Sequence, residues 1–112
     1  MVMRSKVPAR IRKLMKELKE GLVRIYGDRL KALYLYGSYA RGDYVDGSDL
    51  DLLVVLQDYQ RYGDEIVRTS ELVGGLSLEY GITVSRIFMK ESQWRYSKTP
   101  LLRNIQAEGL SA

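Results

Sequence analysis

Two aspartates stand one residue apart at the start of an apolar segment, in the string SDLDLLVV. Side chains alternate across a β-strand, so a strand here would point Asp49 and Asp51 to the same face, with Cα atoms about 7 Å apart. Two ionised carboxylates at this spacing repel each other, and a bound cation relieves the repulsion. Mg²⁺ binds through one or two carboxylates and completes its shell with phosphate oxygens. We therefore predict a metal site at Asp49 and Asp51 for phosphoryl chemistry.

A candidate phosphate-binding turn precedes this pair. A second apolar segment ends in Gly37 and Ser38, and ten residues separate Ser38 from Asp49. Glycine lets a phosphate approach the backbone closely, and exposed N–H groups at a turn or helix start bind anions. The Ser38 hydroxyl would add a donor, and the planar guanidinium of Arg41 suits phosphate oxygens. A Gly-Ser turn or an Asp-x-Asp strand end alone is common, so the prediction rests on their combination.

Several kinds of site are excluded by composition, since the chain contains no cysteine and no histidine. Disulfides, thiolate metal sites and histidine general bases are therefore absent. A metal must be a hard ion bound by oxygen, which favours Mg²⁺ or Mn²⁺ over zinc.

The charge of the chain is uneven. Residues 1–31 hold ten Lys or Arg and three Asp or Glu (+7), whereas the remainder holds eight and eleven (−3), for a net charge of +4. A basic half is compatible with an acidic partner, including RNA or DNA, but the polar face of an amphipathic helix is the preferred explanation, because such a helix needs a polar face anyway. The basic residues lack the interleaved aromatics of a single-strand binding surface, so we do not expect a nucleic-acid partner. No membrane-length apolar run or secretory signal is present, and we expect a cytoplasmic protein.

The remaining pattern predicts one α/β (α+β) domain spanning residues 1–112, a small mixed sheet flanked by helices. Apolar periodicity predicts a first helix with Pro8 in its first turn, and Thr99 is the expected cap of the last helix. The expected segments are a helix over 8–26, a core motif over 30–57 with strands 30–36 and 50–56, a helix over 64–80, a third strand over 82–89 and short helices within 92–109, the first capped by Ser92.

The string GSYARGDYVDGSDLDLLVV closely resembles the minimal nucleotidyltransferases of the DNA polymerase β-like superfamily, of the antitoxin type, with similarity over roughly residues 29–90. The resemblance implies that Gly37 and Ser38 grip a nucleoside triphosphate while Asp49 and Asp51 bind Mg²⁺ and are catalytic. It also implies transfer of a nucleoside monophosphate, AMP from ATP, to a hydroxyl. The expected acceptor is a tyrosine of a HEPN-domain toxin, which this protein would neutralise.

One departure from the family pattern keeps a second hypothesis open. The family often uses a third carboxylate on the next strand, but segment 82–89 has no acid and places Ser85 and Arg86 there. The alternative is a catalytically reduced module that binds nucleotide and neutralises a HEPN partner by contact. Arg86 is a candidate for contact with substrate or for an ion pair with a site aspartate, and Tyr39 and Tyr44 are the better candidates among the tyrosines for touching nucleotide or partner. The oligomeric state stays open.

Overall fold

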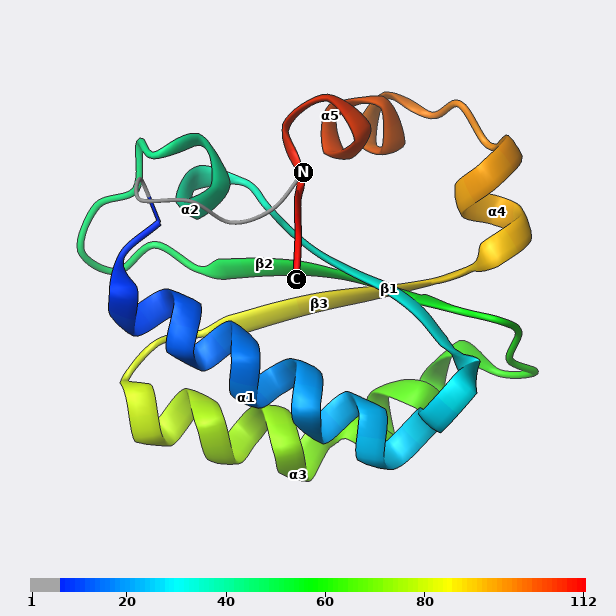
Figure 1. The fold of residues 1–112 in the computed structure, drawn as a ribbon, viewed down its shortest axis with the longest axis horizontal. Helices are drawn as coiled ribbons and strands as arrows, with labels where there is room; N and C mark the ends of the chain where they lie inside the picture. Colours follow the sequence, from blue (N-terminus) through cyan, green and yellow to red (C-terminus); the bar gives the residue numbers. More distant parts are fainter. Residues whose placement is uncertain (1–6) are drawn as a thin grey trace.

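A computed structural model describes residues 7–112 as a four-stranded mixed sheet with helices on both faces (Figure 1). The strand order is β3-β2-β1-β4, with β1 antiparallel to β2 and β4 and with β2 parallel to β3. This confirms the expected fold class. The elements are α1 (Ala9–Tyr26), a 3-10 turn η1 (Gly27–Arg29), β1 (Leu30–Tyr36), α2 (Ser38–Arg41), β2 (Leu50–Leu56), α3 (Tyr62–Tyr80), β3 (Val84–Lys90), α4 (Glu91–Tyr96), α5 (Pro100–Glu108) and β4 (Leu110–Ser111).

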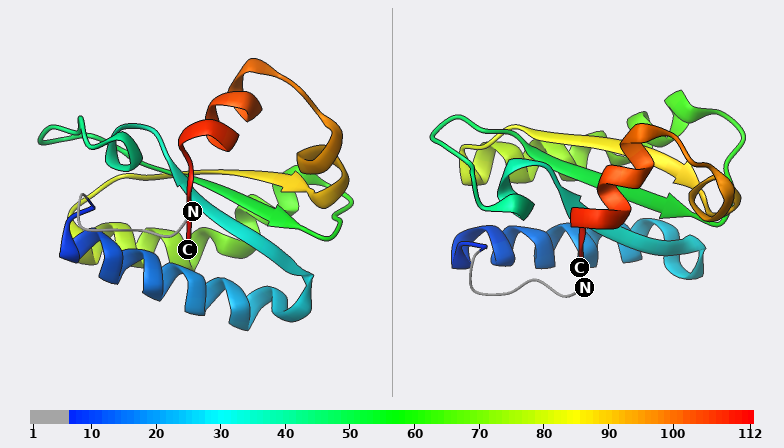
Figure 2. Two further views of the ribbon diagram at one scale, coloured as in Figure 1. Left: turned by 45° about the horizontal axis from the view of Figure 1, so that its top comes forward. Right: turned by 90° about the horizontal axis from the view of Figure 1, so that it is seen from above.

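The two faces of the sheet are covered differently. Helices α1 and α3 lie side by side across one face, whereas α4 and α5 lie over part of the other (Figure 2). Strand β2 is apolar on both faces because it is central: Leu52 and Val54 join the core under α1 and α3, and Leu53 and Val55 join a smaller cluster with Trp94. Alternation places Asp51 on the same face as Leu53, the less covered one. None of the described helices is long and apolar enough to cross a membrane.

Strands β1 and β2 have the predicted bounds, whereas α1, α3 and β3 begin at other residues than predicted. Pro8 is the N-cap of α1 and not part of its first turn, although the predicted apolar stripe is buried. Helix α3 begins two residues before the predicted Asp64 and continues unbroken through Gly74 and Gly75. Strand β3 begins at Val84, later than predicted, because the N–H of Ile82 is still bonded to the Ser77 carbonyl at 3.1 Å.

The C-terminal segment contains an element that the pattern did not predict. Lys90 is the N-cap of α4, so Ser92 does not cap it. Thr99 caps α5 as expected, with its hydroxyl accepting the N–H of Leu102 at 3.3 Å. The two-residue strand β4 then pairs with β1.

Polar contacts tie α1 to α3 on the face of the sheet that these two helices cover, which we call the closed side (Figure 2). Glu65 of α3 is only 3% exposed, and its Oε1 accepts hydrogen bonds from the Tyr26 hydroxyl at 2.8 Å and from Arg68 Nε at 3.1 Å. At the other end of the helix pair the Tyr80 hydroxyl donates to Glu17. A buried carboxylate without partners would be costly, so these donors are needed for the helices to pack here.

We expect Tyr26→Phe to lower the free energy of unfolding by about 1–2 kcal/mol, because Glu65 loses a buried donor. Burial and the hydrogen bond to Glu65 raise the pKa of Tyr26. A raised tyrosine pKa makes the folded state resist ionisation, so part of the stability is lost above the ordinary pKa of about 10. The variant should lose less stability than the wild type above this pH. Urea unfolding across pH measures both effects, and Tyr96→Phe, at a 72% exposed residue, should change neither.

Candidate functional site

The predicted phosphate turn and the predicted metal pair meet where β1 ends beside the start of β2. Tyr36 and Asp51 are direct partners in the antiparallel ladder, so Gly37 follows immediately next to the Asp51 side chain. Gly37 has φ 79° and ψ −156°, a conformation essentially restricted to glycine. A Cβ atom at Gly37 would overlap Oδ2 of Asp51. Glycine is therefore required here by the neighbouring carboxylate as well as by the backbone angle.

Helix α2 is a single turn that starts directly after this glycine. The carbonyl of Gly37 accepts the N–H groups of Ala40 and Arg41 at 3.1 and 3.0 Å. As at any helix start, the N–H groups of Ser38 and Tyr39 have no acceptor within the turn. The turn thus brings backbone donors next to the Asp51 carboxylate at Gly37, and the half-buried Ser38 follows with its hydroxyl. This arrangement suits an anion that is also bound to a cation.

The two aspartates are in different environments. Asp49 is exposed, whereas Asp51 is partly buried. Burial raises the pKa of Asp51, and the neighbouring Asp49 raises it further, while Arg41 acts in the opposite direction. Two neighbouring carboxylates disfavour each other's ionised form, and a hard divalent cation between them would relieve this. The partial burial of Asp51 and the nearness of Asp49 therefore fit a metal site, in addition to the spacing in the sequence.

No third carboxylate joins Asp49 and Asp51 within the part of the chain that the structure describes. Ser85 is the β3 residue aligned with Asp51, and it is exposed on the same face of the sheet. Among residues 7–112 no group of three or more acidic side chains lies close enough to hold a metal ion. The alignment of Ser85 with Asp51 agrees with the sequence-based expectation that serine stands where an acid would be expected.

Arg41 lies near this pair but is engaged by two other acids. Its Nε contacts Oδ2 of Asp43 at 3.1 Å, and its Nη1 contacts Oε1 of Glu108 at 3.1 Å. Glu108 is the last residue of α5 and lies 67 positions along the chain from Arg41. Sequence reasoning missed Glu108 because no local pattern connects a helix end to a distant turn.

Two other expectations about the site require correction. Arg86 points to the closed side of the sheet, where it donates to Thr69 Oγ1 and to the Ile66 carbonyl, each at 2.8 Å. It neither faces the open side nor pairs with a site aspartate, because its place in β3 alternates with that of Ser85. Tyr39 is a buried core residue whose ring stacks on Tyr44 with centroids 4.6 Å apart. Tyr39 therefore packs in the core and also lines a cavity with Arg10 and Asp46. The expectation for the exposed Tyr44 stays a prediction.

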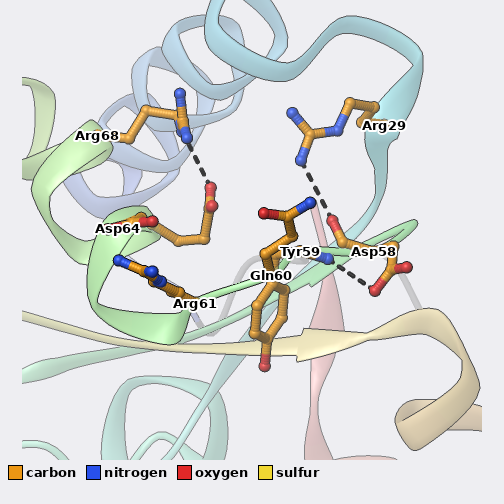
Figure 3. Close-up of a pocket in the computed structure, with 8 residues that line it drawn as sticks. Arg29, Asp58, Tyr59, Gln60, Arg61, Asp64 and Arg68 are labelled. Carbon is orange, nitrogen blue, oxygen red and sulfur yellow. Dashed lines mark hydrogen bonds and ion pairs between the residues drawn. The ribbon is translucent and has the colours of Figure 1, made fainter.

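A separate cavity of about 360 Å³ lies beyond the opposite end of β2 (Figure 3). Its lining contains none of the predicted site residues. Three arginines and three acids line it, so their formal charges cancel: Arg29, Arg61, Arg68, Asp58, Asp64 and Glu65. Several of these are already bonded to each other, including Arg68 to Glu65. We do not assign the cavity to the site at Asp51.

We expect Gly37→Ala to destabilise the free protein by more than Gly42→Ala. Both glycines have positive φ, which costs a residue with a Cβ about 1–3 kcal/mol, but a Cβ at Gly42 meets open space. Only alanine at position 37 would also displace the Asp51 carboxylate. Chemical denaturation of the two variants measures the difference, and adding Asp51→Ala to Gly37→Ala should recover part of it. Equal losses for both glycines would show that the contact with Asp51 has no effect.

Comparison with known proteins places this site in a family. Residues 15–106 match the family described as the nucleotidyltransferase domain. The chain is 35% identical over 104 residues to Putative protein adenylyltransferase MJ0604 of Methanocaldococcus jannaschii, across 87% of this chain and 92% of that protein. The crystal structure of a "putative nucleotidyltransferase" from Sulfolobus solfataricus is 26% identical, with a TM-score of 0.65 over 97% of this chain and 86% of that one.

A further structure shares the fold at lower identity. It is the complex of tri-AMPylated Shewanella oneidensis HEPN toxin with MNT antitoxin, in which the matched chain is 19% identical, with a TM-score of 0.50 over 88% of this chain and 70% of that one. The family match over most of the chain and the relative at 35% identity agree with each other. The protein therefore belongs to the nucleotidyltransferase family.

Proposed function

We propose that this protein transfers AMP from ATP to a tyrosine hydroxyl of a HEPN-type partner and thereby acts as the antitoxin of a toxin–antitoxin pair. The observation that carries the proposal is the contact between the phosphate turn and the metal carboxylate, Gly37 against Asp51. The name of the relative, a protein adenylyltransferase, supports AMP as the transferred group. The Shewanella complex supports the class of partner.

Each residue of the site has a role in this reaction. Asp49 and Asp51 would hold Mg²⁺, or Mn²⁺, which supplies charge neutralisation for the phosphates when bound. The backbone at Gly37 and Ser38 would bind the triphosphate, together with the guanidinium of Arg41. The acceptor oxygen forms a bond to the α-phosphorus while the bond from that phosphorus to the bridging oxygen breaks, and pyrophosphate leaves.

The proton of the acceptor hydroxyl needs a base. No histidine exists in the chain, and Glu79 is a residue of α3, the helix that covers the closed side of the sheet. Asp49, which is exposed next to Asp51, is one carboxylate that could take this proton. Asp51, a water bound to the metal or a group on the partner would be the alternatives.

The second candidate function is a binding module that neutralises its partner by contact without transferring AMP. Ser85 favours it, because this neutral side chain is aligned with Asp51 where a third carboxylate would be expected. The phosphate turn and two aspartates would still bind nucleotide and metal in such a protein. The two functions therefore differ in turnover and not in nucleotide binding.

We expect Asp51→Asn to abolish Mg²⁺-dependent ATP binding while leaving the free protein equally stable or more stable at neutral pH. The pKa of Asp51 is raised from its ordinary 3.8. The folded state therefore disfavours the carboxylate, and stability falls as pH rises above that value. Asparagine cannot ionise, so Asp51→Asn avoids this fall in stability. Its stability advantage over the wild type should therefore disappear at acid pH, where Asp51 is protonated. Calorimetric titration and thermal unfolding measure the two effects, and unchanged ATP affinity would refute the assignment of Asp51.

The reaction itself is tested with labelled ATP, Mg²⁺ and a HEPN-domain protein encoded next to this one. We expect label on a partner tyrosine, and none with Asp51→Asn. Inhibition of the toxin without any label would instead support neutralisation by contact.

A matched pair of variants asks whether the neutral residue on β3 limits turnover. Ser85→Asp places a carboxylate beside Asp51, whereas Ser85→Asn has the same shape without the charge. Faster labelling with aspartate alone would show that the missing acid, and not partner binding, limits the reaction.

A further inference from the structure

Arg41 is held between two carboxylates that do not belong to the metal pair. Asp43 contacts its Nε and Glu108 its Nη1, both at 3.1 Å. A guanidinium binds phosphate in bidentate fashion through Nε with Nη2 or through Nη1 with Nη2. Each of these edges contains one nitrogen that a carboxylate already contacts. A bidentate phosphate would therefore share a nitrogen of Arg41 with Asp43 or Glu108, and the two anions compete for it.

The position of Glu108 is set by the C-terminal segment. Gly109 follows it and packs so tightly that a Cβ would lie 2.5 Å from the Ile105 carbonyl oxygen. This close turn leads directly from α5 into β4, where Leu110 pairs with Leu35 of β1. Strand β1 leads in turn to Gly37. Glu108 is thus anchored to the same strand that positions the phosphate turn, although it is distant in sequence.

The ion pairs of Arg41 are exposed to water, so another anion can replace either carboxylate. The side chains of Arg41, Asp43 and Glu108 are 45%, 63% and 31% exposed. Exposed ion pairs contribute little stability because water screens them, and a triphosphate carries more charge than a single carboxylate. Phosphate can therefore replace Glu108 at a modest energetic cost. That cost reduces the observed nucleotide affinity.

We propose that Glu108 competes with the triphosphate for Arg41, so that the C-terminal helix α5 sets the nucleotide affinity of the site. This inference rests on the proposed function, because it assumes that Arg41 binds ATP. Asp43 is adjacent in sequence and moves with the turn. Glu108 belongs to a different element, so it is the carboxylate whose distance from Arg41 depends on the packing of α5.

Calorimetric titration of Mg²⁺·ATP into Glu108→Gln tests the proposal. We expect binding about two- to fivefold tighter than in the wild type, the range that corresponds to one exposed ion pair. Glu91→Gln is the matched control, because Glu91 forms an exposed pair with Arg95 at 3.8 Å on another helix. It should bind ATP as the wild type does. Thermal unfolding of both variants checks that the fold is kept.

A double-mutant cycle separates competition for Arg41 from a general effect of charge. With Arg41→Gln present, adding Glu108→Gln should no longer change ATP affinity. An equal gain with and without Arg41 would overturn the proposal, and so would weaker or unchanged binding in Glu108→Gln alone. If the wild type binds no nucleotide, the proposed function fails as well, whereas wild-type binding with an unaffected Glu108 variant overturns this inference only.

Discussion

The close approach of the Gly37 backbone to the carboxylate of Asp51 is the constraint on which the rest of the site depends. Antiparallel pairing of β1 with β2 sets two chain segments side by side, and no side chain at position 37 fits between them. A turn that offers N–H donors is thereby held against a carboxylate that attracts cations. A phosphate with a bound metal ion needs groups that attract an anion next to groups that attract a cation. The same backbone angle ends β1 and begins α2, so the strand end and the binding turn are one feature.

The sheet divides structural and chemical tasks between its faces. On the closed side, the buried Glu65 and its donors fasten α1 to α3, and Arg86 is used to hold α3 to β3. On the other side, Asp51 and Ser85 are aligned on neighbouring strands, and Ser85 is exposed. Strand alternation makes this division possible, because neighbouring residues of one strand face opposite layers. A charged residue beside the site in sequence can therefore have a purely structural role.

Charge balance links the site to the end of the chain. Asp49 and Asp51 repel each other's charge, whereas Arg41 has two carboxylates around it. Binding of a metal with a triphosphate would satisfy both groups, since the metal neutralises the aspartates and the phosphate replaces a carboxylate at the arginine. A domain of this size has little room for an acceptor site of its own, and the exposed Ser85 leaves the β3 side of Asp51 accessible. The protein partner of the proposed function would reach Asp51 from this side.

The sequence by itself determined the features that depend on neighbouring residues. Spacing predicted Asp49 next to Asp51, although β2 begins only at Leu50. Periodicity located α1, and Thr99 marked the start of α5, because helical repeat and capping act over a few residues. The tertiary structure alone decided that Arg86 faces α3, that Tyr39 is buried, that β4 exists and that Glu108 reaches Arg41. These outcomes depend on which distant segments pack together, and two residues 67 positions apart carry no local signal of their contact.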